Sequence, residues 1–357
     1  MRIVSANGNF NTIIAKIVYN VNIFLYLGQE MNRNRVTIAD VAAAAGVSMM
    51  TVSRAMNNRN GINVETRTRI LKIAEELGYH PSQLARGLVT RQTSTLGLVM
   101  PDVANPFFAQ IARGAEDVAY ENGYNLFLIN TAEDQQREKN ALRSLLEKEI
   151  EGAVLCSSRL SQEEILPYLK SLPAAVLVNR ELTEANLRVA TLNVNDSGGT
   201  EQAVRYLVSQ KRCKIALIAG PITSISSMRR LEGFKTGCRE FSLACCESQI
   251  VHCSPTTQGG EEAALRLFDQ LPDVDAIIAF NDLVAVGVLH ACLQTRRSVP
   301  GQVAVIGAGD IPLAALTNPS LTTLHVDLAA MGQRAMTALL ELINGGEVSP
   351  QKIVIQP

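Results

Sequence analysis

Arg54 stands in a segment whose side chains suit contact with nucleic acid. A guanidinium can donate to O6 and N7 of one guanine, worth about 1–3 kcal/mol of discrimination. Met49 and Met50 have no useful donors, so we expect them to respond to groove shape and thymine methyl groups. Helical spacing leaves both methionines outward, although they could instead fill a small core. The polar side chains nearby suit phosphate contacts: Ser48, Thr51, Ser53 and Asn57.

The histidines and cysteines do not form a pattern typical of a catalytic or metal site. Four His offer no triad, no G-x-G-x-x-G follows the first strand, and no G-K-[ST] phosphate loop occurs. Cys238, Cys245, Cys246, His252 and Cys253 lie close in sequence but lack the paired ligand spacing of zinc sites. Seven Cys without C-x-x-C favour reduced thiols in the cytoplasm. We expect no catalytic residues, no metal and no cofactor.

Residues 37–78 predict short helices that would position Arg54 and its neighbours. Thr37 is a good N-cap for a first helix, and Gly46 supplies the positive φ of a tight turn. Ser48 then caps a second helix, Met49 to Met56, and a third is expected from about Val64 to Leu77. A helix, a short glycine-containing turn and a capped second helix form a helix-turn-helix. The expected core comprises Ile38, Val41, Val52, Ile70 and Leu77.

Charge is divided unevenly, although the net charge of the 357 residues is only −1. Residues 31–92 carry nine Lys and Arg against four Asp and Glu, a net +5. Residues 1–30 add +1, which leaves −7 for residues 93–357. A basic head on an acidic body is expected where one end meets polyphosphate, with a chance fluctuation as the alternative.

From Thr95 onward, short apolar runs alternate with amphipathic helices, which predicts parallel sheets covered on both faces. Ligands of such folds bind beyond the carboxyl ends of the strands. The expected strands are Leu96–Met100, Asn125–Asn130, Ala153–Cys156, Ala174–Asn179, Lys214–Ala219, Ala276–Phe280 and Val303–Gly307. The expected helices are Phe108–Glu121, Glu133–Lys148, Gly199–Ser209, Arg230–Phe241, Gly259–Leu271 and Asp282–Thr295.

The head carries a specific family resemblance. The strings VTIADVAAAAGVSMMTVSRAMN and TRTRILKIAEELGYHPSQLARGL closely resemble the LacI/GalR family of transcription regulators, and the resemblance continues over roughly residues 35–355. It implies that the helix of Met49, Met50 and Arg54 reads bases in the major groove, at an operator half-site with a T beside a G. Thr37 joins the DNA-contacting residues on the same basis.

Residues 80–92 resemble the family's hinge helix and linker. The resemblance implies that Leu88 enters between base steps in the minor groove and kinks the duplex. Gly87 lowers the intrinsic stability of so short a helix, which suits a segment that folds only on DNA. A plain linker is the competing interpretation of this polar, Pro-led stretch.

The resemblance also implies a body like the periplasmic binding proteins, whose two lobes close on a ligand. We expect one lobe at about 93–191 and 325–340, and the other at about 192–322 and 341–357. The residues that match effector-contacting positions of the family are Asn105, Phe107, Phe108, Arg230, Asn281 and Asp282. As alternatives, Asn281 could simply cap the next helix and Phe107 or Phe108 could belong to the core.

Two departures from the family pattern bear on the effector. Ser254 stands where an aromatic residue is frequent, and Gly309 stands where an Asp is frequent. Without that Asp the pocket is less hostile to anions, so a sugar acid bound partly through Arg230 becomes a hypothesis beside a sugar or a sugar phosphate.

Together these observations predict an all-α helix-turn-helix head (31–79), a hinge and linker (80–92) and a two-lobed α/β effector-binding and dimerisation domain (93–357). Residues 1–30 are expected to be a non-native or disordered extension that ends before a natural start at Met31; they suit neither a signal peptide nor a membrane span. The expected function is a cytoplasmic, homodimeric repressor of carbohydrate or sugar-acid genes that binds palindromic double-stranded operator DNA. An enzyme or a transport-type sugar-binding protein are the alternatives.

Overall fold

The computed structural model describes residues 36–57, 60–79, 93–184, 187–346 and 352–357. The chain divides into two compact units, residues 1–92 and 93–357, which are described separately. The expected extension 1–30 and the expected hinge and linker at 80–92, with Leu88, lie outside the described residues. No helix in the described ranges is long and apolar enough to cross a membrane.

The N-terminal unit contains the predicted helix-turn-helix. Its helices are α2 (Ile38–Ala45), α3 (Met49–Met56) and α4 (Val64–Glu76). Gly46 ends α2 with φ 64°, in the left-handed region that favours glycine, and Ser48 caps α3. The helices enclose a small core of Val41, Ala42, Ala45, Val52, Ala55, Ile70 and Ala74. Leu77, expected in this core, is 40% exposed because it follows the last turn of α4 and Tyr79 packs there instead.

The first lobe of the large unit is built on a parallel sheet that has, within the described residues, six strands in the order β11-β5-β4-β3-β1-β2. The strands are β1 (Thr95–Met100), β2 (Asn125–Asn130), β3 (Gly152–Cys156), β4 (Ala175–Val178), β5 (Val189–Val194) and β11 (Lys352–Ile355). Helices α6 (Pro106–Glu121) and α14 (Leu328–Ile343) cover one face. Helices α7 (Gln135–Glu147) and α8 (Gln162–Ser171) cover the other.

The second lobe repeats this three-layer design. Its parallel sheet has the order β10-β9-β8-β6-β7 in the described part of the chain. The strands are β6 (Ile215–Ala219), β7 (Ile250–His252), β8 (Ala276–Ala279), β9 (Ala304–Gly309) and β10 (Thr322–His325). One face packs on α11 (Thr257–Gln270) and α12 (Asp282–Gln294), and the other on α9 (Asp196–Ser209) and α10 (Ile225–Glu240). Two short elements complete the lobe: η1 (Glu247–Gln249) and α13 (Pro312–Leu316).

The expected lobe boundaries are wrong at two points. β11 pairs in parallel with β5 from Thr191 to Val194, so Lys352–Ile355, expected in the second lobe, complete the sheet of the first. β5 also crosses the expected boundary between residues 191 and 192. It stays in the first lobe because β4 and β11 bond its backbone on both edges, which leaves its buried peptide groups paired.

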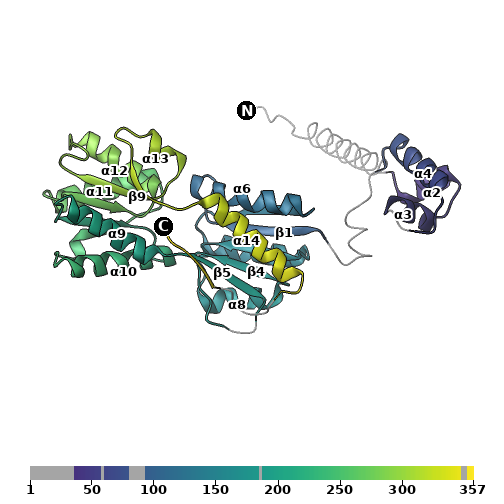
Figure 1. The fold of residues 1–357 in the computed structure, drawn as a ribbon, viewed down its shortest axis with the longest axis horizontal. Coiled ribbons are helices and arrows are strands. Elements are labelled where there is room, and N and C mark those ends of the chain that lie inside the picture. The colour runs from purple at the N-terminus through teal and green to yellow at the C-terminus, as the bar shows by residue number, and fades with distance from the viewer. Residues whose placement is uncertain (1–35, 58–59, 80–92, 185–186, 347–351) are drawn as a thin grey trace, which may run out of the picture. The chain divides into compact units, whose positions relative to one another are not determined.

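Helices α6 and α14 lie side by side over the first sheet (Figure 1), and their backbones nearly touch. A Cβ on Gly114 would lie 2.0 Å from the carbonyl oxygen of Ala329, and one on Gly332 would lie 2.0 Å from that of Ile111. Each glycine therefore opens room for the backbone of the opposite helix. This close approach packs α14, which comes late in the sequence, against α6, which comes early in the first lobe.

Candidate functional site

Helix α3 carries its large side chains toward solvent. Met49 is 56% exposed and Met50 is 65% exposed, so the alternative that they fill the core is wrong. Arg54 is exposed on the same short helix, whose inner face is formed by Val52 and Ala55. The helix thus presents one guanidinium and two flexible apolar side chains to a partner.

The polar residues around α3 are engaged in local hydrogen bonds. The Ser48 hydroxyl accepts from the backbone N–H of Thr51 and lies 2.9 Å from the Thr51 hydroxyl. Asn57 Nδ2 donates to the Ser53 carbonyl at 2.8 Å, at the other end of the helix. These bonds fix the two ends of α3 and hold the hydroxyl and amide groups at its surface.

Thr37 lies exposed at the start of α2, where it forms a capping box with Asp40. Its hydroxyl donates to Asp40 Oδ2 at 2.7 Å, and its backbone N–H donates to the same oxygen at 2.8 Å. These hydrogen bonds lower the pKa of the Asp40 carboxyl. The cap sets where α2 begins and therefore where α3 follows.

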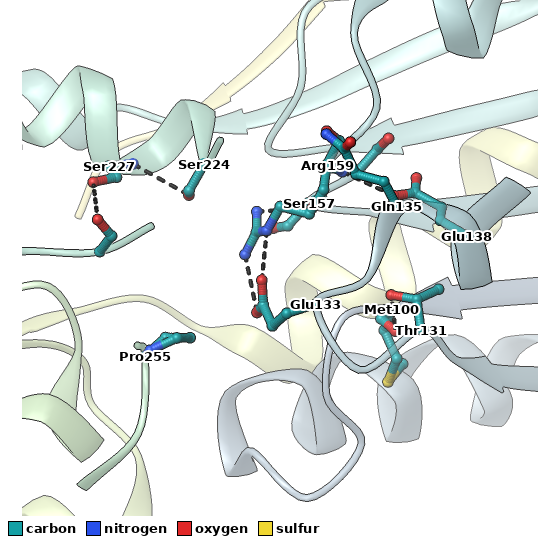
Figure 2. Close-up of polar contacts among 12 residues, drawn as sticks. Met100, Thr131, Glu133, Gln135, Glu138, Ser157, Arg159, Ser224, Ser227 and Pro255 are labelled. Carbon is teal, nitrogen blue, oxygen red and sulfur yellow. Dashed lines mark hydrogen bonds and ion pairs between the residues drawn. The ribbon is translucent and has the colours of Figure 1, made fainter. Parts of the chain in front are cut away.

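In the large unit, residues of both lobes line a cavity. Figure 2 shows part of it, with Glu133, Ser157 and Arg159 of the first lobe on one side and Ser224 and Pro255 of the second on the other. Five of the six residues predicted to contact an effector are among its lining residues: Asn105, Phe107, Phe108, Arg230 and Asn281.

The start of α6 forms one wall of this cavity. Asn105 caps the helix by accepting from the Phe107 N–H at 3.0 Å. Phe107 and Phe108 meet edge to face, with ring centroids 5.1 Å apart. Phe108 is 7% exposed and also belongs to the core of the first lobe, whereas Phe107 is half-buried. Both interpretations of Phe108, core and cavity wall, therefore apply.

Arg230 enters the cavity from α10. The helix begins at Ile225, five residues before the expected start, because Ser224 caps it by accepting from the Ser227 N–H. Nε and Nη2 of Arg230 each lie 2.9 Å from Oδ1 of Asp196, and the guanidinium lies 5.0 Å from the centroid of the Phe280 ring. Arg230 is thus held by a buried carboxylate and an aromatic face.

Asn281 and Asp282 have different surroundings. Asn281 lines the cavity and also caps α12 by accepting from the Val284 N–H at 2.8 Å, so the capping alternative is confirmed alongside its place in the wall. Asp282 is 1% exposed and is not among the lining residues; it accepts from the Thr323 hydroxyl and from the Ile311 N–H. Burial raises the pKa of its carboxyl against these hydrogen bonds.

Several residues of the wall were not predicted from the sequence: Glu133, Ser157, Arg159, Asn179, Ser224, Ser226, Pro255, Phe280 and Ala308. Ser157 and Asn179 follow directly after β3 and β4, so the strand-end rule that found Asn105 and Asn281 could have found them too. Ser254 and Gly309, the two departures, lie in hollows that adjoin the cavity.

A metal site is not formed by the residues that the structure describes, in which no group of three or more His, Cys, Asp or Glu could hold an ion. Cys238 is buried, whereas Cys245 and Cys246 are exposed. Burial raises the thiol pKa of Cys156 and Cys238 to about 12, and that of Cys253 and Cys292 to about 11.

Two family models match the chain. The bacterial regulatory proteins of the lacI family match residues 37–82. The periplasmic binding proteins and sugar binding domain of the LacI family match residues 93–357, which is more than half of the chain. The chain belongs to the LacI family. This regulator thus combines a DNA-binding head with a two-lobed α/β domain, as its resemblance over residues 35–355 predicted.

Relatives of this LacI-family chain include a catabolite control protein and an operon repressor. It is 31% identical to the catabolite control protein A of Priestia megaterium, over 87% of this chain and 93% of that one. It is also 31% identical to the ribose operon repressor of Escherichia coli K12, over 90% of this chain and 97% of that one. The LacI-family chain is therefore a DNA-binding transcription regulator.

Solved structures show the same fold. The transcriptional regulator CelR in complex with cellobiose matches with a TM-score of 0.68 and 28% identity, over 90% of this chain and 97% of that one. The Lac repressor bound to ONPG in the repressed state matches with a TM-score of 0.80 and 24% identity, over the same shares. The predicted fold, a helix-turn-helix head with a two-lobed parallel α/β domain, is confirmed.

Proposed function

We propose that this protein is a repressor that binds palindromic operator DNA as a homodimer and responds to a sugar, sugar phosphate or sugar acid in the cavity between its lobes. The outward side chains of α3 carry the DNA part of this proposal. Arg54 reads a guanine, and Met49 and Met50 meet the neighbouring thymine. Phosphate contacts come from Thr37, Ser48, Thr51, Ser53 and Asn57.

The cavity lining supports the effector part. The lining combines aromatic rings with amides, hydroxyls and two guanidinium groups, which suits a compact hydroxylated molecule. We propose direct contacts from Asn105, Phe107, Phe108, Arg230 and Asn281. Asp282 acts indirectly, because its carboxylate ties α12 to the Ile311 backbone and to Thr323 beneath the cavity. The bound cellobiose of CelR is consistent with a sugar-like ligand.

Exposed apolar side chains of the large unit support a homodimer. Phe127 and Leu128 are 46% and 42% exposed on β2, an edge strand of the first sheet, and Tyr120 lies nearby in sequence at the end of α6. In the second lobe Leu293 and Leu316 are exposed to a greater extent, at 75% and 79%. Edge strands with apolar side chains commonly pair across subunit interfaces. Two heads brought together in this way match the two halves of a palindrome.

We further propose that Leu88 of the hinge kinks the operator, that the chain acts in the cytoplasm and that it catalyses no reaction. The relatives named above are transcription regulators rather than enzymes. Effector binding between the lobes alters the spacing of the two heads and so alters operator affinity.

Selection from random duplexes by the full-length protein tests the DNA part. We expect enrichment of a palindrome with a T beside a G in each half-site, lost with Arg54→Ala. A panel of sugars, sugar phosphates and sugar acids is then tested for release of the selected duplex. Enrichment of duplexes with no shared sequence would overturn the proposal of a specific operator.

A further inference from the structure

The first-lobe wall of the cavity contains an ion pair between Arg159 and Glu133. Arg159 Nε donates to Glu133 Oε2 at 2.6 Å, and Arg159 Nη2 donates to Glu133 Oε1 at 3.1 Å. Figure 2 shows the guanidinium and the carboxylate facing each other in this two-bond arrangement. Both residues line the cavity. The Nε and Nη2 edge of the Arg159 guanidinium, here called its fork, thus binds a carboxylate of the protein itself.

Arg159 is held in place by bonds that do not involve Glu133. Its Nη1 donates to the Ser157 carbonyl at 2.9 Å, and its backbone N–H donates to Glu138 Oε2 at 2.9 Å. Gln135 Nε2 donates to its carbonyl oxygen at 2.6 Å. The side chain of Arg159 is only 5% exposed. The guanidinium therefore keeps its position whichever anion occupies the fork.

Glu133, by contrast, stands on a strained segment at the edge of the cavity. Ala132 and Glu133 have φ of 52° and 61°, two consecutive non-glycine residues in the left-handed region. The Glu133 side chain is 26% exposed, and it also lines a larger hollow beside the cavity. Rotation of the side chain into that hollow would return its carboxylate to water.

We propose that Glu133 is an internal substitute for the effector's own carboxylate, which replaces it on Arg159. The effector is then a hydroxylated carboxylic acid. This inference rests on the proposed function and narrows its ligand class. A neutral sugar cannot displace Glu133, because departure of the carboxylate would leave a buried guanidinium without a counter-ion. An incoming carboxylate preserves the charge and the two hydrogen bonds.

The second guanidinium of the cavity does not offer the same exchange. Nε and Nη2 of Arg230 both bind Asp196, whose side chain is 1% exposed. The hollow that Asp196 shares with Arg230 is smaller than the one beside Glu133. Arg159 is therefore the residue that binds the carboxylate of the effector, whereas the sequence hypothesis gave this part to Arg230. Arg230 then binds hydroxyl groups of the effector.

Acetate tests the exchange without knowledge of the effector. In the full-length Glu133→Ala variant, acetate can enter the vacated fork, so its thermal midpoint should rise by about 2 °C or more in acetate relative to chloride at equal ionic strength. The wild type and the Glu133→Ala/Arg159→Gln double variant should not respond. Glu133→Gln keeps the shape of the side chain and provides a second background in which Arg159 lacks a counter-ion. An equal acetate response with and without Arg159 would refute the exchange.

Calorimetric titration tests the ligand class. The acids are gluconate, glucuronate and galacturonate, and the compounds compared with them are glucose, galactose and glucose 6-phosphate. For an acid that binds, Glu133→Gln should raise the affinity about tenfold, because the competitor is gone, and Arg159→Gln should lower it at least tenfold. Glu184→Gln, which alters an exposed ion pair with Lys170, is the matched control and should change nothing.

Loss of affinity in both variants, or binding of only the neutral sugars or the phosphate, would overturn the proposal. Neither readout uses operator DNA. A protein that binds acids as expected but no duplex would therefore contradict the proposed function alone, and a protein that binds its operator but follows neither expectation would contradict this inference alone.

Discussion

Exposure of Arg54 gives α3 a group with strong hydrogen-bonding specificity. Replacement by Ala should cost about 1–3 kcal/mol of operator binding and should relax the preference for guanine at one position of each half-site. Fluorescence anisotropy with matched duplexes measures both effects. Lys72→Ala is a suitable control, because Lys72 is an exposed residue of α4 that pairs with Glu76. An unchanged base preference in Arg54→Ala would contradict the assignment.

The cysteines should separate into two reactive classes. A raised thiol pKa means that the thiol stays protonated as the pH increases, so the reactive thiolate is scarce at pH 8. We expect iodoacetamide at pH 8 to label Cys213, Cys245 and Cys246 in the native protein. The thiols with pKa about 11 or 12 should remain unlabelled: Cys156, Cys238, Cys253 and Cys292.

Peptide mass spectrometry measures this labelling, and denatured protein, in which all seven react, is the control. Cys253 is the informative residue, because it is only half-buried. Its labelling should increase as the pH is raised toward 11. Rapid native labelling of Cys253 at pH 8 would contradict the expectation.

At the scale of single residues, the sequence predicted those cavity residues that sit at the ends of recognisable strands. Asn105 and Asn281 could be predicted because each is a polar residue that follows an apolar run and precedes a helix. Glu133 and Arg159 were not, because their pairing depends on the backbone conformation at Ala132 and on the packing of α7 against the β3 end. Asp282 was placed in the cavity, but it turns inward to Thr323.

At the scale of the elements, the contact between α6 and α14 requires glycine at two positions, Gly114 and Gly332. Gly114→Ala or Gly332→Ala would press a methyl group against a backbone carbonyl that cannot easily move, so we expect a loss of roughly 1–3 kcal/mol in stability of the first lobe. Urea unfolding of the full-length protein measures it. Glu116→Ala, on the exposed face of α6, should stay within about 0.5 kcal/mol of the wild type.

The sequence predicted best those strands that are continuous apolar runs, whereas the long helix α14 was not predicted. Strands β1, β3, β4 and β6 are continuous apolar runs, as expected for parallel strands covered on both faces. Strand β5 was missed although it is buried, because Thr191 and Asn193 interrupt its apolar run. The other missed strands, β7, β10 and β11, are short and partly exposed, and their residues alone do not differ from those of a loop. They form because a neighbouring strand offers paired backbone groups, which is a property of the assembled sheet.

At the scale of the whole molecule, the effector and the operator must be thermodynamically coupled. If saturating effector lowers operator affinity by some factor, saturating operator must lower effector affinity by the same factor. Calorimetric titration of the effector with and without the selected duplex, and of the duplex with and without the effector, measures the two factors at one fixed salt concentration. Unequal factors would mean that the effector acts outside this two-site scheme.

The two lobes of the large unit differ in whether they are built from one continuous segment of the chain. The second lobe is a continuous stretch from α9 to β10, whereas the first lobe needs α14 and β11 from the end of the sequence to cover and complete its sheet. During synthesis, therefore, the second lobe can fold as soon as β10 leaves the ribosome. The first lobe must wait, with the apolar face beneath α14 uncovered, until α14 and β11 have also been translated.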